Sequence, residues 1–419
     1  MPSPRPDRVL LLSMHTSPVD QPGSGDAGGM NVYVWHLAHA LAQAGWRVDA
    51  ATLNRRPEHT EGVRAEEIAP GIRLLSVAVP GAAAAPKAEL PRFTADFGAA
   101  LARFYARASQ DDDAAAPRVL HAHYWLSAAA GVVVSEALNV PLVLTLHTSA
   151  AAKNLRAGPD EPREPAEREH AERDLVSRVC CTVVNTPVEG EQLVALCGAD
   201  PAKVRVIPPG VDPAVFHPPG DGPQDRGQHP APFTVLCAGR MQPLKGQQVL
   251  VRALGILRRE HPEVPVRLVL AGTGSPEFLE HLRELARVEG VAGDVVFRGS
   301  LPRPELARLM GAVDAVAVAS SSETFGLVAV EAQACGTPVL ATDVDGLRYA
   351  VRDGRTGVLV PGRDPAVWAR ELLRAAREPQ RWRAMSQAAV RRARELTWDD
   401  VAAQHAAAYR ACAPARPTA

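Results

Sequence analysis

The 419-residue chain lacks any long apolar run. A helix that crosses a bilayer needs about 20 consecutive apolar residues, and no segment approaches that length. The first six residues, Met1-Pro-Ser-Pro-Arg-Pro, lead straight into the strand-like run 9–14, without the charged and apolar regions of a secretion signal. These absences argue against a helical membrane protein and lead us to expect a cytoplasmic one.

The chain also has no excess of either charge and few cysteines. It carries 46 basic and 47 acidic residues, a formal net charge of −1, so no global field favours nucleic acid or an anionic membrane as partner. None of the six cysteines stands in a C-x-x-C pair. We therefore expect reduced, mostly buried thiols, with neither a disulfide framework nor a structural zinc site.

Short apolar runs alternate with helical stretches along the whole sequence. This pattern is typical of a parallel sheet covered by helices on both faces, so we expect the α/β class. Strands are predicted at 9–14, 48–52, 72–77, 119–123, 142–147, 179–185 and 204–207, and then at 233–238, 266–272, 295–298, 315–319, 339–342 and 357–360.

A segment rich in Pro, Gly and charge, residues 208–232, interrupts this alternation and is predicted to be a linker. We therefore expect two Rossmann-like, doubly wound domains facing across a cleft: 1–207, and 233–396 after the linker. Ligands are expected at the carboxyl ends of both sets of strands. Residues 397–419 are predicted to form a C-terminal helix and tail.

Two glutamates, Glu323 and Glu331, stand eight residues apart after the predicted strand 315–319. The helix expected to open at Phe325 or Gly326 would direct its unpaired N–H groups, including those of Leu327 and Val328, toward an anion such as a diphosphate. Glu331 would then reach ribose hydroxyls and Glu323 the sugar beyond the phosphates. The alternative is a capping role for Glu323 and a solvated position for Glu331.

Two cations, Arg240 and Lys245, follow the first strand of the second half. At the carboxyl end of a strand they suit a pyrophosphate leaving group, whose negative charge must be stabilised. The alternative is a pair of solvated surface residues, which most such pairs are.

The loop before the first predicted helix contains Gly23-Ser-Gly-Asp-Ala-Gly28, which matches the dinucleotide fingerprint G-x-G-x-x-G. Eight residues, 15–22, separate it from the strand, too long a loop for that tight turn, so we do not expect an NAD enzyme. Gly28 and Gly29 are instead placed to cover a diphosphate, with His15, Gln21, Asp26 and Asn31 in the same loop.

Histidines end two predicted strands, in His121-Ala-His123-Tyr124-Trp125 and in Leu144-Thr-Leu-His147-Thr148. Imidazoles at such positions suit sugar hydroxyls or a phosphate. A single histidine at such a position is more often a structural residue of the core, and we expect this role for His121.

These blocks together resemble the retaining nucleotide-sugar glycosyltransferases of the GT-B fold, and among them the inositol phosphate glycosyltransferases of mycothiol biosynthesis. The resemblance spans nearly the whole chain. It implies that UDP-N-acetylglucosamine is the donor, that no metal or further cofactor is needed, and that His147, Arg240, Lys245 and Glu323 serve catalysis. The implied donor-binding residues are Gln21, Pro22, Gly28, Gly29, Arg240, Lys245, Glu323, Phe325, Gly326, Leu327, Val328 and Glu331.

The resemblance also implies an acceptor site, in which the Lys, Tyr, Thr and Arg clasp an inositol phosphate. Its residues are His15, Asp26, Asn31, Lys87, Tyr124, Thr148 and Arg168. The chain departs from the family pattern near this site, with Gly81-Ala-Ala-Ala-Ala-Pro86 where the family has a Gly-Pro-Tyr-Glu-Gly-Leu type of loop.

An acidic segment beside the expected acceptor site bears on the choice of acceptor. Residues 160–174 hold seven acids against three arginines, an excess of four negative charges, and such a field suits a cation better than a phosphate. We therefore slightly favour 2-deoxystreptamine, the acceptor of related aminoglycoside enzymes, over 1D-myo-inositol 3-phosphate. A non-catalytic sugar-nucleotide sensor is the remote alternative, and the oligomeric state, a homodimer included, is left open.

Overall fold

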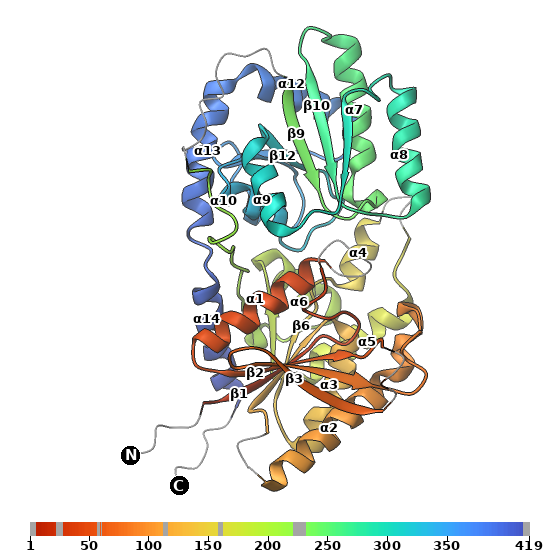
Figure 1. Cartoon of the computed structure of the whole chain (residues 1–419), viewed down its shortest axis with the longest axis vertical. Coiled ribbons are helices and arrows are strands. Elements are labelled where there is room, and N and C mark those ends of the chain that lie inside the picture. Colours follow the sequence, from red (N-terminus) through yellow and green to blue (C-terminus); the bar gives the residue numbers. More distant parts are fainter. Residues whose placement is uncertain are drawn as a thin grey trace. The chain divides into compact units, whose positions relative to one another are not determined.

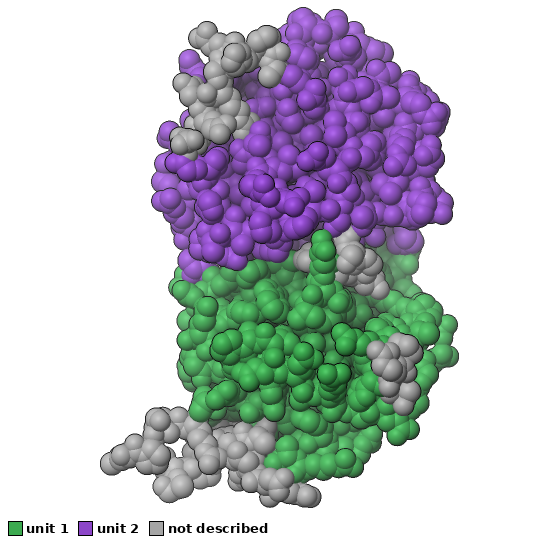
Figure 2. Space-filling model, in the orientation of Figure 1, with its two compact units in different colours: residues 1–155, 163–209, 398–419 green, residues 156–162, 210–397 purple. Residues whose placement is uncertain are grey.

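The computed structural model describes residues 6–21, 28–56, 59, 61–111, 116–157, 162–220 and 232–413. The chain divides into two compact units, shown in Figure 2. Unit 1 comprises residues 1–155, 163–209 and 398–419, and unit 2 comprises residues 156–162 and 210–397. The C-terminal helix, which we expected to follow the second domain as a separate segment, therefore belongs to unit 1.

Unit 1 contains, within its described residues, an eight-stranded sheet in the order β3-β4-β2-β1-β5-β6-β7-β8. All neighbours run parallel except β3 and β4. The strands are β1 (Arg8–Leu12), β2 (Arg47–Leu53), β3 (Gly62–Ala69), β4 (Ile72–Ala78), β5 (Val119–His123), β6 (Leu142–Thr145), β7 (Cys181–Val184) and β8 (Val204–Val206).

Helices cover both faces of this sheet because its central strands are apolar on both sides. In β1, Leu10 and Leu12 enter one hydrophobic core, and Val9 and Leu11 enter another on the opposite face. The helical segments are α1 (Gly29–Gln43), η1 (Lys87–Phe93), α2 (Thr94–Asp111), α3 (Trp125–Leu138), α4 (Ala150–Arg156), α5 (Ala166–Arg178), α6 (Pro187–Cys197), η3 (Pro201–Lys203) and α14 (Trp398–Cys412) (Figure 1).

The C-terminal helix α14 completes the second of these cores beside α1. Trp398 and Tyr409 are buried in the same cluster as Tyr33. The Tyr33 hydroxyl lies 3.1 Å from His405 Nε2, and the Tyr409 hydroxyl lies 2.7 Å from His121 Nδ1. Unit 1 is thus built from the first half of the sequence together with its last helix.

Unit 2 contains, in the part that the structure describes, a six-stranded parallel sheet in the order β11-β10-β9-β12-β13-β14. Its strands are β9 (Phe233–Ala238), β10 (Val266–Ala271), β11 (Val295–Gly299), β12 (Ala315–Val318), β13 (Val339–Thr342) and β14 (Gly357–Val360). Its helical segments are η4 (Pro243–Lys245), α7 (Gln247–Glu260), α8 (Pro276–Val288), α9 (Arg303–Ala312), α10 (Leu327–Ala334), α11 (Leu347–Ala350), α12 (Pro365–Arg377) and α13 (Pro379–Ala393).

The sequence predicted the sheets well, with one omission. Every predicted strand overlaps an observed one, and the bounds of β5, β9, β13 and β14 are those expected. Strand β3 was missed because it is an antiparallel edge strand whose side chains are mostly exposed or half-buried, so it carries little of the apolar signal of the central strands.

In each sheet the strands that follow the first one in sequence are added on one side of it, and later strands are added on its other side. The direction in which strands are added therefore reverses next to the first strand. The reversal lies between β1 and β5 in unit 1 and between β9 and β12 in unit 2. Connections leaving the two neighbouring strands at such a point run to opposite faces, which opens a crevice at their carboxyl ends. The segments that follow β1, β5, β9 and β12 are therefore where ligand-binding residues are expected.

Glycine is required where two of these segments meet in unit 2. Gly246 has φ 77°, and a Cβ atom there would lie 2.1 Å from the backbone oxygen of Ala319. The loop after β9 can approach the loop after β12 only with hydrogen at this position.

We expect Gly246→Ala to lower the free energy of unfolding of unit 2 by about 3 kcal/mol or more, because a left-handed backbone and a backbone clash both oppose it. Urea unfolding followed by tryptophan fluorescence measures this change. Gly290→Ala is the matched control, since Gly290 has φ 74° with no atom within 4 Å of the added methyl group, and we expect it to cost about 1–2 kcal/mol. Equal losses for the two variants would contradict the close approach.

Candidate functional site

In unit 2, the loops after β9 and β12 bring together the cation and the acid that the sequence predicted at separate places. Lys245 ends the short helix η4, and its Nζ lies 2.5 Å from Glu323 Oε2. Both side chains are about one-fifth to one-quarter exposed, at 24% and 21%, so a ligand can reach them. An ammonium group has three donors, which leaves Lys245 two for an anion while it orients Glu323.

The N-terminus of α10 lies in the same loop as Glu323. The helix begins at Leu327, and its N-cap is Gly326 with φ 96°, where a Cβ atom would lie 2.6 Å from Leu347 Cδ2. The first amides of a helix have no intrahelical acceptor and lie at the positive end of its dipole. The backbone amides of Gly326, Leu327 and Val328 are therefore suited to an anion. Phe325 is buried and packs against Tyr349.

Glu331 is buried, so the interpretation of this residue as a solvated one is wrong. It lies one turn into α10, with a relative exposure of 6%, and accepts from Arg303 Nη1 at 3.1 Å. Burial raises the pKa of Glu331, and Arg303 opposes that rise. No local pattern indicates this pairing, because Arg303 stands at the start of α9 and meets Glu331 only through the packing of α9 against α10.

Arg240 follows β9 and is half-buried. Its backbone oxygen accepts from Gln247 Nε2 at 3.0 Å, which fixes the loop. No ion pair of its guanidinium with another described residue is seen, so within that part of the chain its donors are available to a ligand.

In unit 1, the predicted acceptor residues gather around the ring of Tyr124. The Nζ atom of Lys87 lies 5.0 Å from the ring centroid, and Cζ of Arg168 lies 4.7 Å from it. The imidazole of His15 packs against the same ring, with the centroids 4.6 Å apart. Burial lowers the pKa of His15, and Lys87, His147, Arg168 and Arg55 lower it further. His15 is thus neutral at pH 7 in surroundings rich in positive charge.

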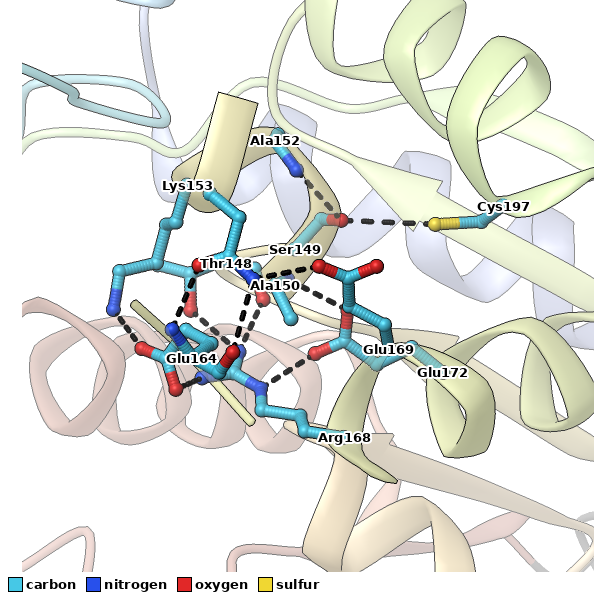
Figure 3. Close-up of polar contacts among 11 residues, drawn as sticks. Thr148, Ser149, Ala150, Ala152, Lys153, Glu164, Arg168, Glu169, Glu172 and Cys197 are labelled. Carbon is cyan, nitrogen blue, oxygen red and sulfur yellow. Dashed lines mark hydrogen bonds and ion pairs between the residues drawn. The ribbon is translucent and has the colours of Figure 1, made fainter. Parts of the chain in front are cut away.

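Thr148 and Arg168 are in direct contact. Arg168 Nη2 donates to the Thr148 carbonyl oxygen at 2.8 Å and to Thr148 Oγ1 at 3.2 Å (Figure 3). The Arg168 side chain is only 4% exposed and also bonds Glu164 and Glu172. Burial disfavours its charge, but Glu172, Tyr124 and Glu164 raise the pKa of Arg168 above its usual value.

The excess of negative charge expected around residues 160–174 is largely compensated. Glu164 bonds Lys153 as well as Arg168, and Asp174 pairs with Arg178 at 3.5 Å. Lys153 and Arg178 lie outside the sequence window in which the charges were counted, which is why the count overstated the field. Asp160 and Glu161 lie outside the described residues.

The half-buried His147 is paired with the buried His123. His147 Nε2 lies 2.9 Å from His123 Nδ1, and the backbone of His147 has φ 61°. Burial lowers the pKa of His147 to about 3 and that of His123 well below its usual value. Both rings are neutral at pH 7, so one nitrogen of the pair donates and the other accepts. His121 bonds Thr145 and Tyr409 and is fully buried, in agreement with its structural interpretation.

The described residues between β1 and α1 make several hydrogen bonds to Asn31. This residue is 1% exposed, and its Nδ2 donates to Thr16 Oγ1 and to the Ser17 carbonyl oxygen while its Oδ1 accepts from the Gly28 amide. Both N–H donors of Asn31 are thus used within the protein. Gln21, Gly28 and Gly29 lie in this segment of unit 1. The predicted residues Pro22 and Asp26, with the glycines of the fingerprint before Gly28, lie outside the described residues.

Arg55 is a further basic residue of unit 1 that the sequence analysis missed. It follows the carboxyl end of β2, and its Nη1 donates to the carbonyl oxygens of Ala82, Ala83 and Ala85 at 3.2, 3.2 and 2.7 Å. It therefore anchors the alanine-rich loop that precedes Lys87. Its position after the end of a parallel strand could have indicated it as a candidate residue.

Comparison with known proteins identifies the family. The model of the glycosyl transferase 4-like domain matches residues 28–210, and that of the group 1 glycosyl transferases matches residues 232–378. The chain is 41% identical over 407 residues to the D-inositol 3-phosphate glycosyltransferase of Paenarthrobacter aurescens, covering 96% of this chain and 97% of the relative. The chain belongs to the GT-B glycosyltransferases. The corresponding protein of Actinosynnema mirum is 43% identical over 409 residues, 96% of each chain.

Solved structures of other glycosyltransferases share the fold of this one. Sucrose-phosphate synthase from Thermosynechococcus elongatus superposes with a TM-score of 0.85 at 28% identity, covering 97% of this chain and 98% of that one. HepE of Anabaena in complex with UDP-glucose has a TM-score of 0.72 at 19% identity, over 96% and 98% of the two chains. The expected GT-B fold of two Rossmann-like domains is confirmed. In the described part of this glycosyltransferase, no helix has the length and apolar character to cross a membrane.

The buried histidines predict how stability depends on pH. The folded-state pKa values of His147 and His405, about 3 and about 4, lie below the unfolded value of about 6.5, and those of His15, His121 and His123 are also lowered. Between pH 6.5 and 5 the unfolded chain binds more protons, so the free energy of unfolding falls as pH falls, by up to about 1.4 kcal/mol per pH unit for each histidine.

Urea unfolding at several pH values in this range measures the slope. We expect His405→Gln to reduce it by up to about 1.4 kcal/mol per pH unit, because one titrating group is removed. His170→Gln is the control, since His170 is exposed in α5. A slope of zero for the wild type between pH 6.5 and 5 would contradict the neutral buried state of these rings.

Proposed function

We propose that this glycosyltransferase transfers N-acetyl-D-glucosamine from UDP-N-acetylglucosamine to a hydroxyl of 1D-myo-inositol 3-phosphate, with retention at the anomeric carbon, as a step of mycothiol biosynthesis. The observation that carries the acceptor is the placement of Lys87 and Arg168 against the ring of Tyr124, with Thr148 bonded to Arg168. Two cations and a hydroxyl suit a phosphate. The names of the curated relatives support the same acceptor.

The donor half of the proposal rests on unit 2. The diphosphate would bind to the first amides of α10 and to Arg240 and Lys245, whose donors are available as described above. Glu323, oriented by Lys245, would accept from sugar hydroxyls, and Glu331 from the ribose. HepE, a protein of the same fold, holds UDP-glucose, so a UDP-sugar is a donor class that this fold accommodates.

The proposed reaction needs little covalent help from the protein. The bond between the sugar C1 and the diphosphate oxygen breaks, and a bond from C1 to the acceptor oxygen forms on the same face. The proton of the acceptor hydroxyl goes to the departing phosphate oxygen. Arg240, Lys245 and the α10 amides stabilise the negative charge of UDP as it leaves, and the bound positions of the two substrates supply the rest of the acceleration.

The acceptor that the sequence slightly favoured, 2-deoxystreptamine, has less support. That preference rested on a negative field from residues 160–174, and most of the described acids in this segment are paired with cations. The ammonium group of Lys87 beside the ring of Tyr124 opposes a diamine. The aminocyclitol therefore becomes the second candidate.

We expect Lys245→Ala to lower kcat/KM by about two to three decades, since loss of one charged contact to the leaving group costs about 2–4 kcal/mol in the transition state. The assay measures UDP release from UDP-N-acetylglucosamine with 1D-myo-inositol 3-phosphate. Lys203→Ala is the control, because Lys203 Nζ contacts only the Val179 carbonyl oxygen among its described partners, in unit 1. Unchanged kinetics of a folded Lys245→Ala variant would refute the diphosphate assignment.

The two acceptors are separated by Lys87→Ala. With 1D-myo-inositol 3-phosphate we expect KM to rise by about 10-fold or more, since a charge-assisted contact to the phosphate is lost. With 2-deoxystreptamine the same change would relieve repulsion and lower KM. Turnover of 2-deoxystreptamine but not of the inositol phosphate by the wild type would show that the proposed acceptor is wrong.

A further inference from the structure

Nearly all the hydrogen-bond donors of Arg168 are already occupied. Its Nε donates to Glu172 Oε1 at 2.7 Å, its Nη1 lies 2.8 Å from Glu164 Oε2, and its Nη2 bonds both oxygens of Thr148 (Figure 3). A guanidinium group has five N–H donors, so among the contacts of the described residues one remains, on Nη1. A phosphate needs more than this to bind Arg168 in the bidentate manner that makes arginine effective.

The two carboxylates that hold Arg168 differ in how firmly they are fixed. Glu172 has no exposure and also accepts from the Ala150 amide at 2.7 Å. It ties α5 to the start of α4 and cannot leave without exposing two buried partners.

Glu164 is placed differently. It precedes α5, and its side chain is 20% exposed. Its backbone is tethered, because its amide donates to Asn154 Oδ1 at 2.7 Å and its carbonyl oxygen accepts from Asn154 Nδ2 at 3.0 Å. Only the carboxylate bridges Arg168 and Lys153. The carboxylate can therefore turn toward solvent while the backbone stays in place.

A carboxylate and a phosphate are recognised by the same cationic groups. We propose that Glu164 is a specificity-determining residue that competes with the phosphate of the acceptor for Arg168 and Lys153, so that binding of the phosphate displaces its carboxylate. This inference rests on the proposed function. An acceptor without a phosphate cannot displace the carboxylate of Glu164. That carboxylate then continues to neutralise Arg168 and Lys153.

Direct competition makes a prediction different from that of a general negative field. Glu167 lies three residues from Glu164, is exposed in the first turn of α5 and carries the same charge. If only the field matters, removing either charge has a similar effect. If Glu164 competes through contact, its removal matters much more, because exposed charges are strongly screened.

The test measures binding of inorganic phosphate to the full-length wild type, Glu164→Gln and Glu167→Gln by isothermal titration calorimetry. We expect Glu164→Gln to bind phosphate about fivefold to tenfold more tightly and Glu167→Gln to change the affinity by less than about twofold. Binding seen in Glu164→Gln alone supports the proposal as well. No phosphate binding by any of the three proteins, unchanged or weaker binding by Glu164→Gln, or equal gains in both variants would overturn it.

Kinetics supply a second, separate readout. With 1D-myo-inositol 3-phosphate we expect Glu164→Gln to lower KM and to leave kcat within about twofold, since the competing group acts on acceptor binding and not on the departure of UDP. Glu164→Ala, checked by its melting curve, should act in the same direction. If the inositol phosphate is not turned over but phosphate binding responds to Glu164→Gln as expected, the proposed function fails and the competition stands. A raised KM in both folded variants would refute the competition alone.

Discussion

The carboxyl ends of β9 and β12 are neighbours only because the strand order of unit 2 reverses there. The contacts of the candidate residues Arg240, Lys245 and Glu323 depend on that arrangement. It places Lys245 beside Glu323 across 78 residues of sequence, and it directs the first amides of α10 to the same end of the sheet as Arg240. The close approach of the two loops requires hydrogen at Gly246, so a backbone constraint and a charge contact act at one place.

Unit 1 uses the same reversal between β1 and β5 but adds a helix from the far end of the chain. Helix α14 supplies His405 and Tyr409, which bond Tyr33 and His121 beneath the strand ends. The rings of His121 and His405 are buried, and burial lowers the pKa of each, so both are neutral at pH 7 and bond the two tyrosine hydroxyls in that form. The surroundings of Tyr33 and His121 thus depend on residues that follow unit 2 in the sequence.

The charges near Tyr124 show why local counting is a poor guide to the character of a site. Arg168 is compensated by Glu172 from its own helix and by Glu164, and Glu164 is shared with Lys153 of α4. A buried guanidinium held by two carboxylates is fixed in position, which favours geometric selection of a ligand over simple attraction. Arg55, which fixes the loop before Lys87, adds a cation that the sequence pattern around Lys87 did not indicate.

The sequence by itself determined the class of fold, the central strands and the loops in which the candidate residues lie. Apolar runs with helical stretches between them are a local signal, and in parallel sheets functional side chains follow the strand ends, so Lys245 and Glu323 were predicted without coordinates. Tyr124 was predicted from the resemblance to the family. Only the tertiary structure decided which charges meet. The pairing of Glu331 with Arg303 and of Glu164 with Lys153, and the return of α14 to unit 1, arise from packing between segments that no local pattern connects. Burial is likewise a property of that packing, which is why the state of Glu331 could not be predicted from its place on a helix.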